Sequence, residues 1–144
     1  ALQGLPAIAL SQFYGPANNA LDDPFEAAAA HGAACVKNIL ENGIWDARDY
    51  RMFYNVNFPP CPAADVKGTR ITTQGYRRET KHSVAPFESP TGRMFMWVRG
   101  GAQAVDTGEG TDVKANVDGF ISVTPLQCDL TDHAAIAALK DRRE

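Results

Sequence analysis

The spacing of hydrophobic residues changes several times along this chain, and each change predicts a different element. Residues 6–10 form a short continuous apolar run that ends at Ser11, as expected of a strand buried on both faces of a parallel sheet. Apolar or small residues then recur at helical spacing up to residues 42–43; they are Phe25, Ala28, Ala29, Gly32, Val36, Ile39 and Leu40. Residues 50–57 alternate weakly and end before two prolines. Together these segments predict a strand–helix–strand unit of a layered α/β fold.

The second half of the chain predicts a different kind of structure. Residues 69–76 and 93–99 are β-prone, and the polar segment between them ends in a Ser-Pro-Thr-Gly turn, which predicts a long hairpin or extended arm. Residues 94–98 are apolar on both faces, so Phe95 and Trp97 need a cover, and we expect a partner subunit to provide it. A strand over 119–125 and a helix over 132–143 complete the prediction.

Size and composition indicate one soluble globular domain. The 144 residues are 44% hydrophobic and 22% charged, with a net charge of -3, which argues against disorder and against general polyanion binding. No apolar run approaches the ~20 residues of a bilayer span, so we expect no membrane partner. The three cysteines lack the spacing of a zinc site and are odd in number, which favours the cytoplasm over an oxidising compartment.

Charge is distributed unevenly. Residues 67–99 carry seven basic against two acidic side chains, a net charge of +5, while the remainder carries -8, which together give the -3 of the chain. One interpretation is that the basic arm meets the acidic body of a neighbouring subunit. The other is that the arm attracts phosphorylated substrates toward a nearby site. Nucleic-acid binding is not expected, because the acidic remainder would repel a polyanion.

Few residue patterns point directly to chemistry. Asp22 and Asp23 could bind a divalent cation, but Pro24 and Glu26 behind them favour Asp23 as the cap of the following helix. In the segment Gly110-Thr111-Asp112, either Thr111 or Asp112 could cap a short helix through Val117 while the backbone N–H groups before it face a ligand; turn and cap chemistry alone would also explain the segment. His133 follows Asp129 by four residues, a spacing that favours an ion pair or hydrogen bond over catalysis.

Four stretches of the sequence resemble one known family. They are Gly-Glu-Gly-Thr-Asp-Val-Lys-Ala-Asn-Val-Asp-Gly-Phe-Ile-Ser-Val-Thr-Pro-Leu-Gln-Cys-Asp at 108–129, Gly-Leu-Pro-Ala-Ile-Ala-Leu-Ser at 4–11, Asn-Val-Asn-Phe-Pro at 55–59 and Lys-Gly-Thr-Arg-Ile-Thr at 67–72. They resemble the SurE family of survival-protein phosphatases, which are metal-dependent 5′-nucleotidases. The resemblance implies that residues 1–144 form a single domain, the C-terminal portion of a three-layer α/β/α Rossmann-like fold with a protruding β-hairpin arm at 67–99 for oligomerisation.

The same resemblance implies a function for the complete protein. It is hydrolysis of a nucleoside monophosphate to nucleoside and phosphate, with exopolyphosphatase activity as a second reaction. The family places its Asp-Asp pair, and the Ser and Asn that complete its metal site, upstream of Ala1. We therefore expect the ligands of Mg²⁺ or Mn²⁺ outside this chain, and we expect the chain alone, as the second half of an enzyme, to be inactive. The alternative is a non-catalytic oligomerisation or scaffold module that lacks the metal site.

Site residues are assigned on this basis, with none of them catalytic. Ligands in open α/β sheets bind beyond the carboxyl ends of the strands, so the substrate-binding candidates are Ser11, Gly110, Thr111 and Asp112. A homodimer or homotetramer is expected, and its interface candidates are Arg77, Phe95, Trp97, Asp129 and His133.

Overall fold

A computed structural model describes residues 3–45, 52–78, 81–102 and 104–142. The first elements are β1 (Ala7–Gln12), α1 (Pro16–Asn19), α2 (Glu26–Asn42), β2 (Phe53–Phe58) and the 3₁₀ turn η1 (Ala63–Asp65). They are followed by β3 (Thr69–Ile71), β4 (Ser83–Glu88), β5 (Met94–Arg99), α3 (Asp112–Val117), β6 (Ile121–Leu126) and α4 (His133–Asp141).

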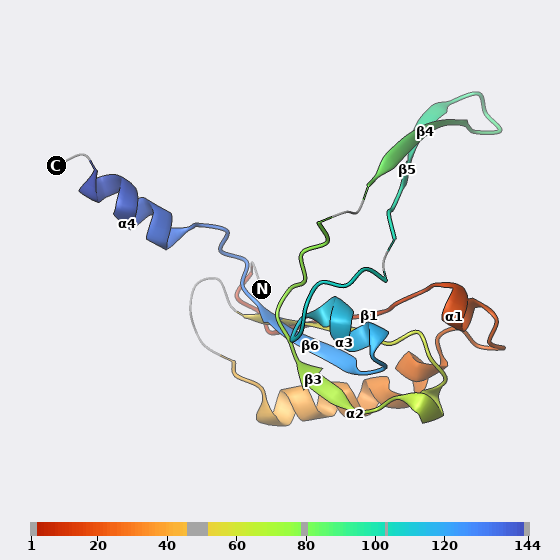
Figure 1. Cartoon of the computed structure of the whole chain (residues 1–144), viewed down its shortest axis with the longest axis horizontal. Coiled ribbons are helices and arrows are strands. Elements are labelled where there is room, and N and C mark those ends of the chain that lie inside the picture. Colours follow the sequence, from red (N-terminus) through yellow and green to blue (C-terminus); the bar gives the residue numbers. More distant parts are fainter. Residues whose placement is uncertain (1–2, 46–51, 79–80, 103, 143–144) are drawn as a thin grey trace.

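The body of the molecule is a mixed sheet in the order β1-β2-β6-β3. Strands β1 and β2 are parallel and α2 connects them, β6 runs antiparallel to β2, and β3 runs parallel to β6. Helix α2 covers one face of the sheet and α3 lies over the other (Figure 1). This confirms the predicted strand–helix–strand unit and the layered α/β fold class.

The two faces of the sheet differ in chemistry because β2 alternates strictly between them. Tyr54, Val56 and Phe58 are buried toward α2, where they form the core with helix residues and with β6; the other core residues are Ala27, Cys35, Ile39, Ile121 and Val123. Asn55 and Asn57 point the opposite way, to the face that α3 covers. The alternation therefore marks a strand with one apolar face and one amide-bearing face.

Strand β1 and helix α2 differ in part from the prediction. Among the described residues β1 is an edge strand, and Leu10 is 49% exposed rather than buried on both faces. The buried face of α2 includes Cys35, which the predicted stripe omitted, whereas Leu40 of that stripe is 57% exposed. The hydrophobic periodicity correctly predicted the helix and the residue at which it ends. The apolar residues of α2, however, extend around more of the helix than the face that packs on the sheet.

The prediction that Asp23 caps α2 is wrong. The helix begins at Glu26, after a turn in which Asp23 Oδ1 accepts a hydrogen bond from the Phe25 N–H at 2.9 Å. A free N–H of the first helical turn, on Ala28, is instead bonded by Gln12 Oε1 from β1 at 2.9 Å. The Glu26 carboxylate accepts from the Ala63 N–H at 2.8 Å, so it ties α2 to η1 instead of closing a capping box.

The arm is a two-stranded hairpin of β4 and β5 that projects from the body (Figure 1). Its first strand is not at 69–76 as predicted, because Thr69–Ile71 pairs with β6 inside the main sheet. Phe95 and Trp97 on β5 are 51% and 63% exposed. Helix α4 also extends away from the body, and its apolar residues Ile136 and Leu139 face solvent. In the described part of the chain, no helix is both long and apolar enough to cross a bilayer.

Candidate functional site

A polar cavity of about 410 Å³ opens at the edge of the sheet where β1 and β2 end. Both strands run parallel, so their carboxyl ends meet at this edge, the usual position for ligands in such sheets. The base of the arm and helix α3 complete the walls. The lining residues are Ser11, Gln12, Phe13, Asn55, Asn57, Arg77, Asp112, Val113, Asn116 and Val117.

The floor of the cavity is set by a pair of residues that lie opposite each other on adjacent strands. Ser11 of β1 is in register with Asn57 of β2, and the Ser11 hydroxyl donates a hydrogen bond to Asn57 Oδ1. This bond uses the amide oxygen, so the amide nitrogen is the part of the Asn57 side chain that is left for another partner. The amide nitrogen of Asn57 has no acceptor among the residues that the structure describes, and it remains available as a donor.

Helix α3 forms one wall and is held there by a buried amide. Asn116 is 8% exposed and its Nδ2 donates to the Asn57 carbonyl at 2.9 Å and to the Phe120 carbonyl at 3.0 Å. Elsewhere in the sheet, the buried hydroxyls of Thr72, which follows β3, and Thr124 of β6 are 2.8 Å apart and satisfy each other. Helix α3 is thus held on the polar face of the sheet by the Asn116 amide, together with its buried apolar residues Val113 and Ala115.

The two ends of α3 are fixed by local sequence. Thr111 is the N-cap, as one prediction had it, with its hydroxyl accepting from the Lys114 N–H at 3.4 Å. At the other end Gly119 has φ +87°, and the Gly119 and Phe120 N–H groups donate to the Asn116 and Ala115 carbonyls. This is the Schellman ending of a helix, which favours glycine because other residues are strained at that φ.

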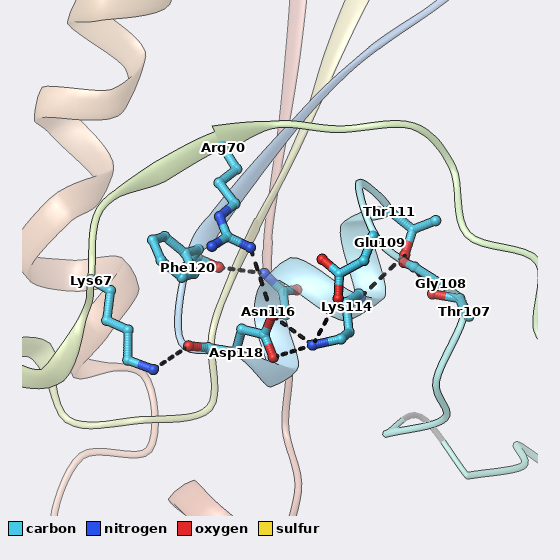
Figure 2. Close-up of polar contacts among 10 residues, drawn as sticks. All are labelled: Lys67, Arg70, Thr107, Gly108, Glu109, Thr111, Lys114, Asn116, Asp118 and Phe120. Carbon is cyan, nitrogen blue, oxygen red and sulfur yellow. Dashed lines mark hydrogen bonds and ion pairs between the residues drawn. The ribbon is translucent and has the colours of Figure 1, made fainter.

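Charged side chains cluster around the end of α3, and one ion pair joins the helix to β3 (Figure 2). Lys114 Nζ lies 2.6 Å from Asp118 Oδ1 and 3.6 Å from Glu109, while Arg70 approaches Asp118 at 3.6 Å. The hydrogen bond between Lys114 and Asp118 lowers the pKa of the Asp118 carboxyl and raises the pKa of the Lys114 amine. The Arg70 guanidinium also lies 3.6 Å from the centre of the Phe120 ring, a cation–π geometry.

The segment Gly110-Thr111-Asp112 connects α3 to the base of the arm. The Gly110 carbonyl accepts from the Thr73 N–H at 3.0 Å, and the Asp112 N–H donates to the Thr73 carbonyl at 2.9 Å. Asp112 Oδ1 then accepts from the Gly75 N–H at 2.8 Å. We call this set of bonds the latch. It fixes the segment that precedes Arg77 beside α3, and Arg77 lines the cavity.

The structure brings together some of the predicted site residues and separates others. Ser11 and Asp112 line the cavity, whereas Gly110 and Thr111 serve the latch and the helix cap beside it. Arg77, assigned to the oligomer interface, lines the cavity as well. Contact of these residues with a substrate stays a prediction.

The remaining interface candidates lie away from the cavity. Phe95 and Trp97 are on the exposed arm, and His133 Nε2 is 2.9 Å from Asp129 Oδ2 at the start of α4, as their spacing predicted. Hydrogen bonds from His133 and from Thr131 lower the pKa of Asp129 to about 2. Their place in an oligomer interface stays a prediction.

Sequence reasoning did not select Asn55, Asn57 and Asn116 as site residues, although all three line the cavity. The signal for the first two was present. They occupy alternate positions of a strand whose other positions are large and apolar, so they had to share the opposite face. Asn116 gave no comparable signal, because its position depends on how α3 folds back onto β2.

The described residues do not fit a divalent metal centre by themselves. Within the described ranges no three His, Cys, Asp or Glu side chains lie close enough to hold an ion together. Asp112 is the carboxylate of the cavity lining, and one of its oxygens is already bonded to the Gly75 and Val113 N–H groups.

Comparison with known proteins places this architecture in a family. The family model described as "Survival protein SurE" matches residues 1–81. The 5′-nucleotidase SurE of Cereibacter sphaeroides strain ATCC 17029 / ATH 2.4.9 is 58% identical over 140 residues, which cover 97% of this chain and 54% of that protein. The 5′-nucleotidase SurE of Ruegeria pomeroyi is 53% identical with the same coverage.

A solved structure agrees with the sequence comparison. The SurE protein of Aquifex aeolicus matches with a TM-score of 0.66 and 32% identity, covering 98% of this chain and 53% of that one. The chain therefore spans about half the length of the relatives that it matches. The family match covers more than half of the chain and extends from β1 through β3 to the base of the arm. This chain belongs to the SurE family.

Proposed function

We propose that the complete protein hydrolyses phosphate monoesters of nucleotides as a 5′-nucleotidase, releasing a nucleoside and phosphate. The observation that carries the proposal is the 58% identity to a 5′-nucleotidase SurE over 97% of this chain, a stretch that includes every residue lining the polar cavity. A basic residue and several amides in that lining suit an anionic, oxygen-rich substrate. Polyphosphate, a chain of the same phosphoryl groups, is the second substrate that we propose.

The proposal includes a divalent metal, Mg²⁺ or Mn²⁺, in the complete protein. No group of three His, Cys, Asp or Glu side chains among the described residues could hold the ion, which supports placing its ligands in polypeptide beyond them. The part contributed by this chain is the scaffold and one side of the pocket. The cytoplasm is the compartment that we propose, consistent with three cysteines that are all free thiols.

A second candidate function is a non-catalytic assembly module. The observation that favours it is the exposure of apolar side chains on two projecting elements, the arm and α4. Such surfaces are typical of contacts between subunits. The two functions are compatible in a homodimeric or homotetrameric nucleotidase. They are alternatives only if this chain forms no part of the catalytic pocket.

The deciding experiment compares two polypeptides in one assay. The first is the 144-residue chain, and the second is a longer polypeptide that supplies the half of the relatives not matched by this chain. Phosphate release from AMP is measured with Mn²⁺ and again with a chelator. We expect chelator-sensitive turnover from the long polypeptide and none from the chain alone.

Each result has a clear consequence. Chelator-sensitive turnover by the 144-residue chain would show that the metal site lies within it, against our placement. Absence of turnover from the long polypeptide with AMP, other nucleotides and polyphosphate would leave the assembly module as the better function. The control replaces AMP with adenosine, which has no phosphate, so any phosphate detected with adenosine is background.

A further inference from the structure

One cavity residue that the family assignment leaves without a role is in position to contact the substrate directly. Asn57 lies one residue before the end of β2, at the edge of the sheet where the cavity opens. Its backbone is fixed on both sides, by Ser11 of β1 and Ser122 of β6 in register and by the Asn116 amide on its carbonyl. The side chain therefore projects from a rigid position.

In the structure the Asn57 amide turns its oxygen toward Ser11. Because the Ser11 hydroxyl donates to Oδ1, the Nδ2 hydrogens are the part of the side chain left for a ligand. A flipped amide would place Nδ2 against the hydroxyl and offer the ligand an acceptor. In the arrangement that the structure shows, the bond with Ser11 leaves a donor at this point of the cavity.

The charge of the cavity favours an anion at that donor. Arg77 is the basic residue of the lining, and its guanidinium has no carboxylate partner within the described part of the chain. Asp112, the acidic residue of the lining, already bonds two backbone N–H groups through one oxygen. A neutral donor and a basic side chain without a carboxylate partner among the described residues, lining one cavity, suit a phosphoryl oxygen better than they suit a metal ion.

We propose that the Asn57 amide nitrogen donates a hydrogen bond to a phosphoryl oxygen of the substrate, and that Ser11 is the positioning residue that orients this amide. The inference rests on the proposed phosphomonoesterase function. It also changes the role of Ser11, which was predicted to bind substrate and instead acts through its neighbour.

The test is binding of inorganic phosphate to the 144-residue chain with a chelator present. Side-chain amide signals are followed by ¹H–¹⁵N NMR, and affinity is obtained from the titration. In the unmodified chain we expect the Asn57 Nδ2H₂ signal to move with phosphate. Asn57→Ala should weaken binding about tenfold or more, as for loss of a hydrogen bond to a charged group. Asn57→Asp should weaken it further, because a carboxylate repels the anion.

Variants of Ser11 separate positioning from direct contact. Ser11→Ala should weaken phosphate binding in the unmodified background and have no additional effect in the Asn57→Ala background, while Ser11→Thr should restore binding because it keeps the hydroxyl. The matched control is Asn38→Ala, which removes an exposed asparagine of α2 bonded only to Asn42 in the described structure. It should bind phosphate as the unmodified chain does.

Three outcomes would overturn the inference. The first is absence of phosphate binding to the unmodified chain, and the second is unchanged phosphate affinity in Asn57→Asp. The third is an Asn57→Ala variant that loses adenosine binding but still binds phosphate, which would make the amide a sugar contact. The result is separable from the proposed function. Turnover of AMP by the long polypeptide with no effect of Asn57 variants removes only this inference, and Asn57-dependent phosphate binding without any turnover removes only the proposed function.

Discussion

The body and the projecting arm contain the same kinds of residues in strands, yet their environments are opposite. In β2, Val56 and Phe58 are 0% exposed because α2 covers their face. In β5, Phe95 and Trp97 are more than half exposed because nothing among the described residues covers either face of the hairpin. Hydrophobicity alone therefore does not separate a core strand from an interface strand. What separates them is that Asn55 and Asn57 alternate with buried apolar residues in β2, whereas residues 94–98 of β5 include no polar side chain.

The comparison also shows how the two regions are joined. Arg77 lies where the chain leaves the body for the arm, and the latch fixes this point to α3. Body and arm are thus distinct in packing but share one boundary at the candidate site.

The largest effect expected from this comparison is on folding of the body. Phe58→Ala removes a fully buried aromatic side chain from the core and should lower the free energy of unfolding by about 3–5 kcal/mol. Trp97→Ala removes a larger side chain from the arm. In the monomer it should change the free energy of unfolding by no more than about 0.5 kcal/mol. Urea denaturation at low protein concentration measures both.

Equal losses in the two variants would contradict the division into a packed body and an unpacked arm. A large loss for Trp97→Ala that grows with protein concentration would instead show that the arm is buried between subunits, because association then contributes to stability.

The parts of the fold that sequence predicted are those set by local pattern. The extent of α2 and the closing helix followed from periodicity, and the Thr111 cap and the hydrogen bond between Asp129 and His133 followed from spacing. The pairing of Thr69–Ile71 with β6 could not be predicted, because the β-propensity of a segment does not indicate which strand it pairs with. The sequence also did not predict the exposure of Leu10, because a short apolar run has the same pattern in an edge strand as in a central strand.

The candidate site was only partly predictable for the same reason. Ser11 and Asp112 were found because they follow or begin recognisable elements. Asn116 reaches the cavity through a hydrogen bond to a residue 59 positions away in the sequence, which no local pattern encodes. Arg77 was assigned to the interface because it begins the segment predicted to form the arm, whereas in the structure it lies two residues beyond the latch and lines the cavity.

The second prediction concerns the latch. Asp112→Ala removes the acceptor for the Gly75 N–H and should destabilise the chain by about 1–3 kcal/mol, the range for a lost bond to a charged group. In the complete protein the same change should reduce turnover of AMP while leaving Mn²⁺ affinity nearly intact. Asp112→Asn retains an oxygen acceptor and should lose less. The measurements are urea denaturation, AMP kinetics and Mn²⁺ binding.

Two results would count against this view of the latch. If Mn²⁺ binding collapses in Asp112→Ala, the residue belongs to the metal site. If Asp112→Asn is as unstable as Asp112→Ala, the carboxylate charge matters more than the geometry of the bond to Gly75.

The third prediction addresses the arm, with little expected change in the stability of the body. Replacing residues 81–99 by a short Gly-Ser linker removes β4 and β5, which form a separate two-stranded sheet. We expect a smaller oligomer by light scattering, because apolar side chains such as Phe95 and Trp97 are then missing from the proposed interface. Unchanged mass, together with ready quenching of Trp97 fluorescence in the intact chain, would show that the arm is an exposed loop.

The smallest effect expected is electrostatic and lies at the root of α4, the second projecting element. The bond from His133 is the main cause that lowers the pKa of Asp129 from its ordinary value of 3.8 to about 2, with Thr131 as the second donor. A carboxyl whose pKa is depressed in the folded state contributes stability above its unfolded pKa, and that contribution is lost as the pH falls from about 4 to about 2. A titration of the Asp129 carboxyl followed by ¹³C NMR should therefore show a midpoint near 2. His133→Ala should raise the midpoint toward 3.8 without reaching it, because Thr131 still donates. Lys140→Ala, also on α4, should leave the midpoint unchanged. An ordinary midpoint in the unmodified chain would mean that the hydrogen bond between His133 and Asp129 does not persist in solution, and that α4 is joined to the body by a flexible segment instead of a fixed turn.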